Sequence, residues 1–306
     1  MSASKIITII PNWNLKDDLK ACIDSLLKQA EVEQEIVVVD NGSQDGSVEE
    51  IHNRYPEVHL IALTENLGYA GALNLGIMYA LENSARYILL LNNDTLIPED
   101  VLHKLLSVLE SDRSIGIVAP KILYNSNRKI VFALGDKRFR WLPVPIGYGY
   151  RKKDRPQFSG QMEFDYVTGC AMLVRADVFR KTGLFNEAYF MYFEDADFCY
   201  RVREDGYRIV CYGDAVIYHK ASLSAKKDHS NSIKIRARNR VWFYRSHLHG
   251  PHPWLTDFVL IVVAIYRSIS FLLYGQKEYI RPYIFGLLEG WKKAVPNPIY
   301  SEGKPT

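Results

Sequence analysis

The 306-residue sequence has little cysteine and lacks the motifs of zinc proteins and dinucleotide enzymes. Its four cysteines are scattered without a Cys-x-x-Cys pair, which argues against a zinc site and against a disulfide framework. No Gly-x-Gly-x-x-Gly follows the first apolar segment, so a nicotinamide-dependent oxidoreductase is not indicated. Internal repeats and low-complexity segments are absent as well. Reduced cysteines are typical of a cytoplasmic protein, and this is the localisation that we expect.

Long apolar runs are also missing from the sequence. Ile6–Ile10 is too short for a signal peptide and predicts the first β-strand. Near the other end, Phe258–Tyr266 contains nine uncharged residues, but Asp257 and Arg267 flank it. A stretch of that length is too short to span a bilayer, so no membrane-spanning helix is predicted.

The first half of the sequence alternates between strand and helix patterns. Apolar positions from Leu19 to Ala30 recur with helical spacing, and Asn14 is the predicted cap of that helix. Alternating strands and helices predict an α/β fold with a mostly parallel sheet flanked by helices. The predicted strands lie at residues 6–10, 35–39, 58–63, 87–91 and 115–119.

Residues 121–163 interrupt this alternation. They mix Arg, Lys, Gly, Pro and aromatic residues without a period, which predicts a long functional loop or lid. Strand-like segments return at residues 170–174, 208–212 and 215–218. We divide the chain into a catalytic domain, residues 1–225, and a basic, aromatic helical region, residues 226–306.

The net charge of +3 hides an asymmetry between these parts. From Lys220 onward there are 14 basic and 5 acidic residues, against 24 basic and 30 acidic residues before it. Residues 236–245 interleave basic and aromatic residues. A helix lying in a membrane interface, a helical layer on the core and a dimer interface all fit this pattern. A non-catalytic module that binds membranes or nucleic acid through this region is an alternative function.

Polar segments follow the apolar runs at the expected strand ends. Tyr87–Leu91 suits a strand buried on both faces, and Asn92, Asn93 and Asp94 follow it directly. Parallel strands bring their carboxyl ends to one crevice, so Asp94 is a candidate anchor for a divalent cation and a diphosphate. A turn with Asp as a helix cap is the alternative. Asp40, which ends the second strand, is placed to accept from a base or a ribose hydroxyl.

A second acidic segment contains Glu194, Asp195 and Asp197 at the start of a predicted helix. An aromatic run precedes it, and a Gly-containing segment around Gly169 lies upstream. Acidic residues at a helix N-terminus are also stabilised by the helix dipole, which is the simpler explanation. His219 ends another strand-like run, and neutral histidine is a good ligand for divalent metals, although a purely structural histidine fits as well.

Taken together, these segments resemble the family 2 glycosyltransferases, which have the GT-A fold, and within them the rhamnosyltransferase-type enzymes. Residues 37–47 resemble the nucleotide-binding segment of that family, residues 92–94 its Asp-x-Asp metal motif and residues 193–197 its catalytic acidic motif. The resemblance covers about residues 5–222. The matching positions are residues 37–47, 66–76, 92–94 and 193–197, together with Arg201 and His219.

Two positions depart from the family pattern. Asn92 stands where the metal motif has its first Asp, so one carboxylate is missing. Asn74 ends a block that often ends in Arg, which weakens the expectation of a phosphate-binding arginine there.

The resemblance implies a role for each matching residue. Asp195 is the expected catalytic base, with an ordinary carboxylate pKa of about 4 that keeps it ionised at neutral pH. Asp94 and His219 are the expected ligands of Mn²⁺ or Mg²⁺. The expected contacts of the nucleotide-sugar are Pro11, Asn14, Asp40, Asn66, Gly71 and Asn93. The expected contacts of the acceptor are Glu194, Asp197 and Gly169.

The resemblance also implies an inverting reaction. The expected donor is a UDP- or dTDP-linked sugar such as rhamnose, and the acceptor is a saccharide or a lipid-linked saccharide in cell-surface polysaccharide synthesis. A peripheral location on the cytoplasmic face of the membrane and a homodimer stay open, and nucleic acid is not an expected partner. A sugar-phosphate nucleotidyltransferase is the alternative enzyme, but it needs a Gly-rich basic loop where this sequence has Pro11–Leu15.

Overall fold

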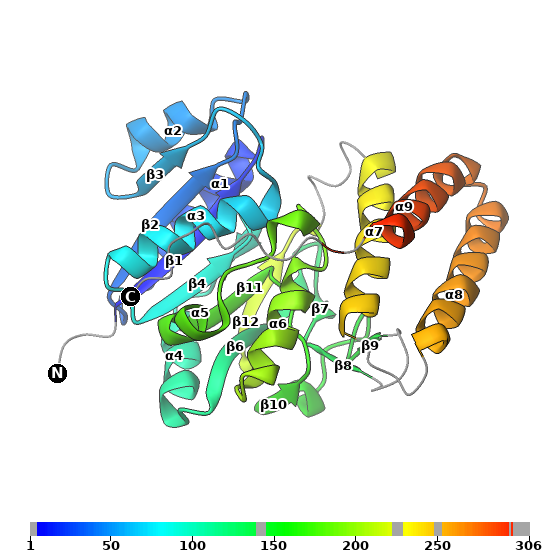
Figure 1. The fold of residues 1–306 in the computed structure, drawn as a ribbon. Helices are drawn as coiled ribbons and strands as arrows, with labels where there is room; N and C mark the ends of the chain where they lie inside the picture. Colours follow the sequence, from blue (N-terminus) through cyan, green and yellow to red (C-terminus); the bar gives the residue numbers. More distant parts are fainter. Residues whose placement is uncertain (1–4, 139–144, 222–228, 248–252, 294, 296–306) are drawn as a thin grey trace.

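A computed structural model of the chain describes residues 5–138, 145–221, 229–247, 253–293 and 295. A mixed sheet with helices on both faces forms most of the molecule, and three C-terminal helices stand beside it (Figure 1).

The N-terminal half of the sheet is parallel. β1 (Ile6–Asn12) lies between β2 (Gln34–Asp40) and β4 (Tyr87–Leu91), and β3 (His59–Ala62) pairs with β2. The register places Asn12 opposite Asp40. The carboxyl ends of these strands therefore meet at one edge of the sheet, as the sequence predicts.

The other half of the sheet is mixed. The strand order is β10-β12-β6-β11-β4-β1-β2-β3, with β11 antiparallel to both of its neighbours. The short β5 pairs with the end of β12, which places Thr95 opposite His219. This pairing brings His219 next to Asp94 although the two residues are far apart in the sequence. The strands are β5 (Thr95–Leu96), β6 (Ile115–Tyr124), β10 (Gln161–Phe164), β11 (Ala171–Arg175) and β12 (Arg208–His219).

The sheet separates two apolar layers. Successive side chains of a strand point to opposite faces, so Ile7 and Ile9 join one layer, and Ile6 and Ile10 join the other. Each such fully buried side chain contributes roughly 1.5–3 kcal/mol to folding. The helices that cover these layers are α1 (Lys16–Leu26), α2 (Ser47–Arg54), α3 (Gly68–Glu82), α4 (Val101–Ser111), α5 (Ala176–Thr182) and α6 (Glu194–Glu204).

The predicted irregular segment at residues 121–163 is largely regular, so this prediction was wrong. β6 extends to Tyr124, and antiparallel strands follow it. Partly exposed antiparallel strands carry mixed side chains, and for that reason they give no uniform apolar run. Residues 139–144 of the predicted lid lie outside the described residues. The additional elements are β7 (Asn127–Ala133), β8 (Asp136–Arg138), β9 (Pro145–Gly147) and the 3-10 helix η1 (Pro156–Phe158).

The predicted cap of the first helix was also wrong. α1 begins at Lys16, whose backbone N–H donates to Asp45, and Asn14 lies before the helix. The Asn14 side chain instead accepts from the backbone of Gln44.

Three helices form the C-terminal region, and α9 packs closely along α7. A Cβ added at Gly286 would lie 2.1 Å from the Lys234 carbonyl oxygen, so this close packing requires glycine. The proposed boundary between residues 225 and 226 lies outside the described residues and stays a prediction. The elements are α7 (His229–His247), α8 (Pro253–Leu273), the 3-10 helix Lys277–Tyr279 and α9 (Ile280–Lys292).

α8 is longer than the nine-residue uncharged run suggests. Its Trp254–Leu273 stretch has 20 residues, and among the described helices α8 alone is long and apolar enough to cross a membrane by length and composition. The helix includes Asp257 and Arg267, the two charged residues that flank the uncharged run.

Candidate active site

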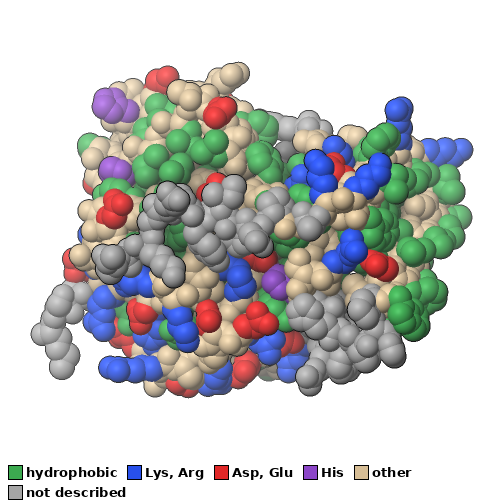
Figure 2. Space-filling view, viewed as in Figure 1, with side chains coloured by type: hydrophobic (Ala, Val, Ile, Leu, Met, Phe, Trp, Pro, Cys, Tyr) green, Lys and Arg blue, Asp and Glu red, His purple; other side chains and the backbone are tan. Residues whose placement is uncertain are grey.

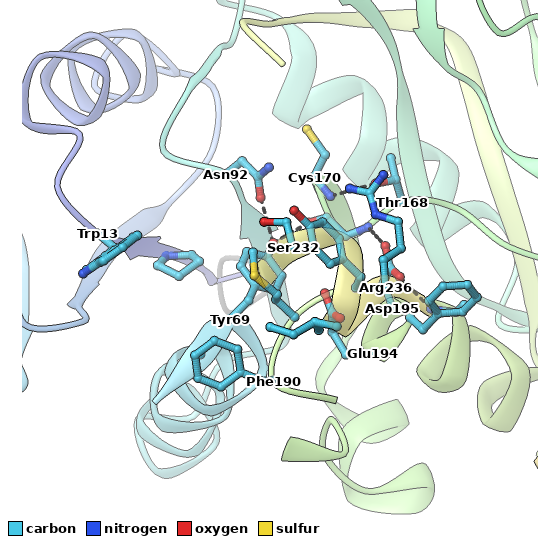
Figure 3. A pocket seen from close by; sticks show the side chains of 18 of the residues that line it. Trp13, Tyr69, Asn92, Thr168, Cys170, Phe190, Glu194, Asp195, Ser232 and Arg236 are labelled. Carbon is cyan, nitrogen blue, oxygen red and sulfur yellow. Dashed lines mark hydrogen bonds between the residues drawn. The ribbon is translucent and has the colours of Figure 1, made fainter. Parts of the chain in front are cut away.

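A pocket of about 710 Å³ opens at the edge where the parallel strands end. The ends of β1 and β4, the segment before β11, the start of α6 and one face of α7 contribute to its wall. In Figure 3, Trp13 lies at the opposite end of the view from Asp195 and Arg236. The predicted donor and catalytic segments therefore share one cavity.

Asn12 links the ends of three parallel strands. Its Nδ2 donates to Asp40 Oδ2 at 2.8 Å, and its Oδ1 accepts from Asn93 Nδ2 at 2.7 Å. Asp40 also accepts from the backbone N–H of Ser43 and is only 1% exposed. Asp40 thus lies behind Asn12 and orients it, and a direct contact of Asp40 with a donor stays a prediction.

The remaining predicted donor contacts fall into two groups. Pro11, Asn66 and Asn93 line the pocket. Asn14 and Gly71 are not among its lining residues.

Asn14 and Gly71 have local structural roles. The Asn14 N–H donates to Ser43 Oγ at 2.9 Å, which holds the segments after β1 and β2 together. A Cβ added at Gly71 would lie 2.9 Å from the Leu67 Cβ, so glycine permits close packing at the start of α3.

Asp94 and His219 form the candidate metal centre. The His219 Nε2 lies 2.9 Å from Asp94 Oδ1, and both residues are nearly buried in the pocket wall. Burial opposes the protonated imidazole, but the neighbouring Cys170 and Asp94 outweigh burial and raise the pKa of His219 to about 10.

One carboxylate and one imidazole suit a Mn²⁺ or Mg²⁺ ion that takes its other ligands from substrate phosphates and water. Among the described residues, no group of three or more His, Cys, Asp or Glu side chains is placed to hold a metal. The chain therefore fits a cation that is held jointly with a bound diphosphate, and a cation would compete with the proton shared by Asp94 and His219.

Asn92, which replaces the first Asp of the metal motif, has a partner on α3. The Tyr69 hydroxyl lies 2.8 Å from Asn92 Oδ1 and 2.9 Å from the Gly169 carbonyl oxygen. Burial raises the pKa of Tyr69 well above its ordinary value, so the hydroxyl stays a donor. A neutral amide accepts this bond without adding negative charge near Asp94 and Asp195.

Asn74, at the other departure from the family pattern, is buried. Its side chain bonds the backbone of Phe185 and the carboxylate of Glu187. It fixes the segment after α5 and lies away from the pocket.

Asp195 is held by three donors at the start of α6. Its Oδ2 accepts from the Tyr166 hydroxyl and the Gly169 N–H, each at 2.8 Å, and its Oδ1 accepts from the Ala196 N–H. Burial raises the pKa of Asp195 above its ordinary value even though these bonds oppose the change. The expectation of an ordinary pKa was wrong, because the surrounding protein removes much of the water that would solvate the carboxylate.

Gly169 packs closely against Asp195. A Cβ added at Gly169 would lie only 3.2 Å from the Asp195 Cβ, so the absence of a side chain permits the close approach. Gly169 also lines the pocket.

Glu194 differs from its neighbour in its partners. Its Oε2 is buried and has no hydrogen-bond partner among the described residues. Burial, followed by the nearby charge of Asp195, raises the pKa of Glu194 well above its ordinary value. Because Asp195 has three donors and Glu194 Oε2 has none, the pair favours an ionised Asp195 beside a protonated Glu194.

Asp197 is not among the residues that line the pocket. It accepts from Arg201 Nε at 2.9 Å, and His247 Nε2 at the end of α7 lies 2.7 Å from its other oxygen. Burial opposes its ionised form, but His247 and Arg201 prevail and lower the pKa of Asp197. The residue joins α6 to α7, and its predicted contact with an acceptor stays a prediction.

The segment before α6 is strained and is held by α7. Phe190, Tyr192 and Phe193 all have left-handed φ angles, between 63° and 72°. Such residues cost on the order of 1–3 kcal/mol each and persist only where surrounding contacts enforce them. Asn239, fully buried on α7, donates to the carbonyl oxygens of Tyr189, Met191 and Tyr192 at 2.8–2.9 Å.

α7 also supplies side chains to the pocket itself. Ser232 and Arg236 reach into it from this helix (Figure 3). The Arg236 guanidinium lies 4.1 Å from the centre of the Tyr192 ring. The sequence predicts this helix as part of a separate basic region, because nothing in a sequence indicates that residues 40 positions apart share a cavity.

Solved structures share the fold at low sequence identity. A Pyrobaculum calidifontis mannosyltransferase, PcManGT, in complex with GDP-Man and Mn²⁺ aligns with a TM-score of 0.57 and 16% identity, covering 94% of this chain and 87% of that chain. Staphylococcus aureus TarS, residues 1–349, aligns with a TM-score of 0.59 and 16% identity, covering 95% and 81%. These likenesses confirm the GT-A fold.

Relatives in sequence cover most of the chain. The hexosyltransferase Agl10 of low-salt glycan biosynthesis in Haloferax volcanii is 27% identical over 95% of this chain and 92% of its own length. The dTDP-rhamnosyl transferase RfbF of Shigella flexneri is 25% identical over 94% and 95%. The N-acetylglucosaminyl-diphospho-decaprenol L-rhamnosyltransferase of Mycobacterium tuberculosis is 26% identical over 74% and 79%. The family model described as "Glycosyl transferase family 2" matches residues 7–183, which is more than half of the chain, so the chain belongs to this family.

Proposed function

We propose that this glycosyltransferase moves a sugar from a UDP- or dTDP-linked donor to an acceptor hydroxyl, with inversion and with a divalent cation. Rhamnose is the proposed sugar, because two relatives in sequence are named rhamnosyltransferases. The proposed acceptor is a saccharide or a lipid-linked saccharide in cell-surface polysaccharide synthesis. The named substrate of the Mycobacterium tuberculosis relative, a sugar diphosphate on decaprenol, supports the lipid-linked form.

One observation carries the proposal. The pocket that contains the Asp94–His219 pair also contains Asp195, a carboxylate with a raised pKa. A group that binds a cation and a diphosphate and a group that accepts a proton are the two requirements of transfer from a nucleotide-sugar. A non-catalytic binding module needs neither.

The donor side of the reaction rests on the strand ends. Asp94 and His219 would hold the cation, which neutralises charge on the departing diphosphate when bound. Asn12 and Asn93 present amide groups at the same edge; Asp40 orients Asn12, which in turn accepts from Asn93. Arg236 is the cationic side chain on the facing wall.

The acceptor side rests on Asp195. Its carboxylate removes the proton of the acceptor hydroxyl as that oxygen forms a bond to the anomeric carbon. The bond from that carbon to the diphosphate oxygen breaks on the opposite side, so the configuration inverts and the nucleoside diphosphate leaves. Tyr166 and the Gly169 N–H hold the carboxylate in place throughout. The raised pKa makes Asp195 a stronger base than an ordinary aspartate.

Calorimetric titration of the full chain with UDP and with dTDP, each with and without Mn²⁺, tests the donor assignment. Metal-dependent binding of one nucleotide is expected, and it would identify the base of the donor. Failure of both nucleotides to bind in the presence of Mn²⁺ would contradict the proposal. His219→Ala is expected to weaken this Mn²⁺-dependent binding. His103→Ala, which changes an exposed histidine on α4, is the matched control.

A further inference from the structure

The outer face of α8 and α9 exposes an unusual number of apolar side chains. In the described part of the chain, 13 of the 17 exposed large hydrophobic residues lie between Trp254 and Leu288. Green side chains cover the right-hand edge of the molecule in Figure 2, where Figure 1 shows α8 and α9. Soluble monomers rarely expose a contiguous apolar patch larger than about 300–600 Å² without a function.

On α8 these residues form one continuous stripe. Their spacing follows the turns of the helix, so they share the side that faces away from the rest of the protein. Leu273 is 80% exposed and Tyr266 is 69% exposed. The stripe consists of Trp254, Phe258, Ile261, Val262, Ile265, Tyr266, Ile269, Leu272 and Leu273.

The opposite side of α8 is fixed to the protein. Leu260 is buried in the same cluster as Tyr283 of α9. Asp257 accepts from Trp291 Nε1 at 2.9 Å and lies 3.5 Å from Arg245 Nε of α7. A helix docked in this way presents one face along its length, which suits contact with a surface better than passage through a bilayer.

The exposed charges around the stripe are mainly basic. Arg267, Lys277 and Arg281 are exposed, against one exposed acidic residue, Glu278, in the same region. Glu289 is neutralised by ion pairs with two basic residues of α7. Trp254 begins the stripe and the exposed Tyr274 directly follows it, and such residues are typical of side chains that lie at the level of lipid headgroups.

We propose that the α8–α9 outer face binds the surface of an anionic membrane, with α8 lying in the plane of the interface. The apolar stripe enters the boundary of the acyl chains, and Arg267, Lys277 and Arg281 contact lipid phosphates. α7 joins this face to the pocket, because it packs on α9 and supplies Arg236 to the pocket wall. Delivery of a lipid-linked acceptor along this route rests on the proposed function, whereas membrane binding itself does not.

A second copy of the chain is the other candidate occupant. A symmetric dimer through this face would bring the same basic side chains of two copies together, because a two-fold interface uses the same patch twice. Anionic lipids complement these charges instead, and for that reason we favour the membrane.

Vesicle flotation of the full chain tests the proposal. The wild type is expected to float with phosphatidylcholine vesicles that contain phosphatidylglycerol, and more weakly with phosphatidylcholine alone. Ile265→Glu/Leu272→Glu is expected to lower the bound fraction at least about tenfold, since charged side chains enter the acyl region at a cost. Leu27→Glu is the matched control: Leu27 is 45% exposed and Leu272 is 50% exposed, but Leu27 lies on the far side of the fold.

A second measurement does not depend on disruptive variants. Brominated lipids are expected to quench the fluorescence of the wild type, and Trp254→Phe is expected to remove most of that quenching.

Three results would overturn the proposal. The first is that the wild type binds neither kind of vesicle. The second is that the double variant binds vesicles as well as the wild type. The third is that light scattering shows a dimer that the double variant dissociates, without any vesicle binding. Nucleotide titration of the same variants separates the two proposals. Flotation without nucleotide binding would contradict the proposed function but not the proposed membrane binding.

Discussion

The two walls of the pocket are built in different ways. The strand-end wall, which contains Asn12, Asn93 and Asp94, is positioned by the register of a parallel sheet. The helix wall, which contains Asp195 and Glu194, follows a strained segment that depends on hydrogen bonds from α7. The first wall is an outcome of local strand packing, and the second requires an element more than 40 residues away in the sequence.

This difference gives the two walls different sensitivities. Changes in the strand-end wall are expected to affect donor binding, because the sheet keeps its shape when a terminal side chain is lost. Changes in the support of the helix wall are expected to affect turnover, because they move Asp195 relative to a donor that still binds.

Among the changes that leave Asp195 in place, removal of the cation is expected to have the largest effect. Chelation of divalent metal, or Asp94→Ala, should lower turnover by about 10³-fold and weaken nucleotide binding, since charge on the leaving diphosphate is no longer offset. Measurement of turnover and of nucleotide affinity checks this. Restoration of activity by Mn²⁺ in the wild type but not in the variant would support the assignment, and equal activity with chelator would contradict it.

Asn239→Ala is expected to lower kcat by roughly 10- to 100-fold, because small misplacements of a catalytic group are costly. The variant leaves the carbonyl oxygens of Tyr189, Met191 and Tyr192 without their donor, so the strained segment can relax. The donor KM is expected to change by less than about threefold, or about 0.7 kcal/mol, because the strand-end wall is unchanged. An unchanged kcat would show that α7 does not position the helix wall.

Asn12→Ala is the counterpart on the strand-end wall. It removes the bonds to Asp40 and Asn93, each worth roughly 0.5–1.5 kcal/mol, and is expected to raise the donor KM about tenfold with little change in kcat. Steady-state kinetics with varied donor measures both constants. A loss confined to kcat in this variant would contradict the proposed difference in function between the two walls.

The pH dependence is expected to show the smallest effect. Asp195 must be ionised to accept a proton, and burial raises its pKa. Activity is therefore lost as pH falls through a value above 3.8, the ordinary pKa of aspartate. Glu194→Gln is expected to leave this acidic limb in place, because Glu194 already holds its proton. A profile of kcat/KM against pH that falls only near the ordinary value would contradict the raised pKa.

Much of the sheet and half of the pocket could be predicted from the sequence. Tyr87–Leu91 is a buried strand with the predicted bounds, and the polar residues after β1, β2 and β4 converge because parallel strands end at one edge. His219 lies beside Asp94 for the same kind of reason, through the pairing of β5 with β12.

The rest depends on packing between distant segments. Nothing in the local sequence around Tyr166 or Asn239 indicates that one bonds Asp195 and the other holds the segment before it. The exposure of α8 also could not be predicted from the sequence, since an apolar stripe has the same residue pattern whether protein or lipid covers it.

We propose Asp195 as the base of a transferase whose donor site is built separately. Turnover and nucleotide affinity of Asp195→Asn test this assignment. The account predicts a loss of turnover of about 10³-fold or more with nucleotide affinity within about twofold of the wild type, because amide and carboxylate have the same shape and only one accepts a proton. Turnover close to that of the wild type would contradict the account.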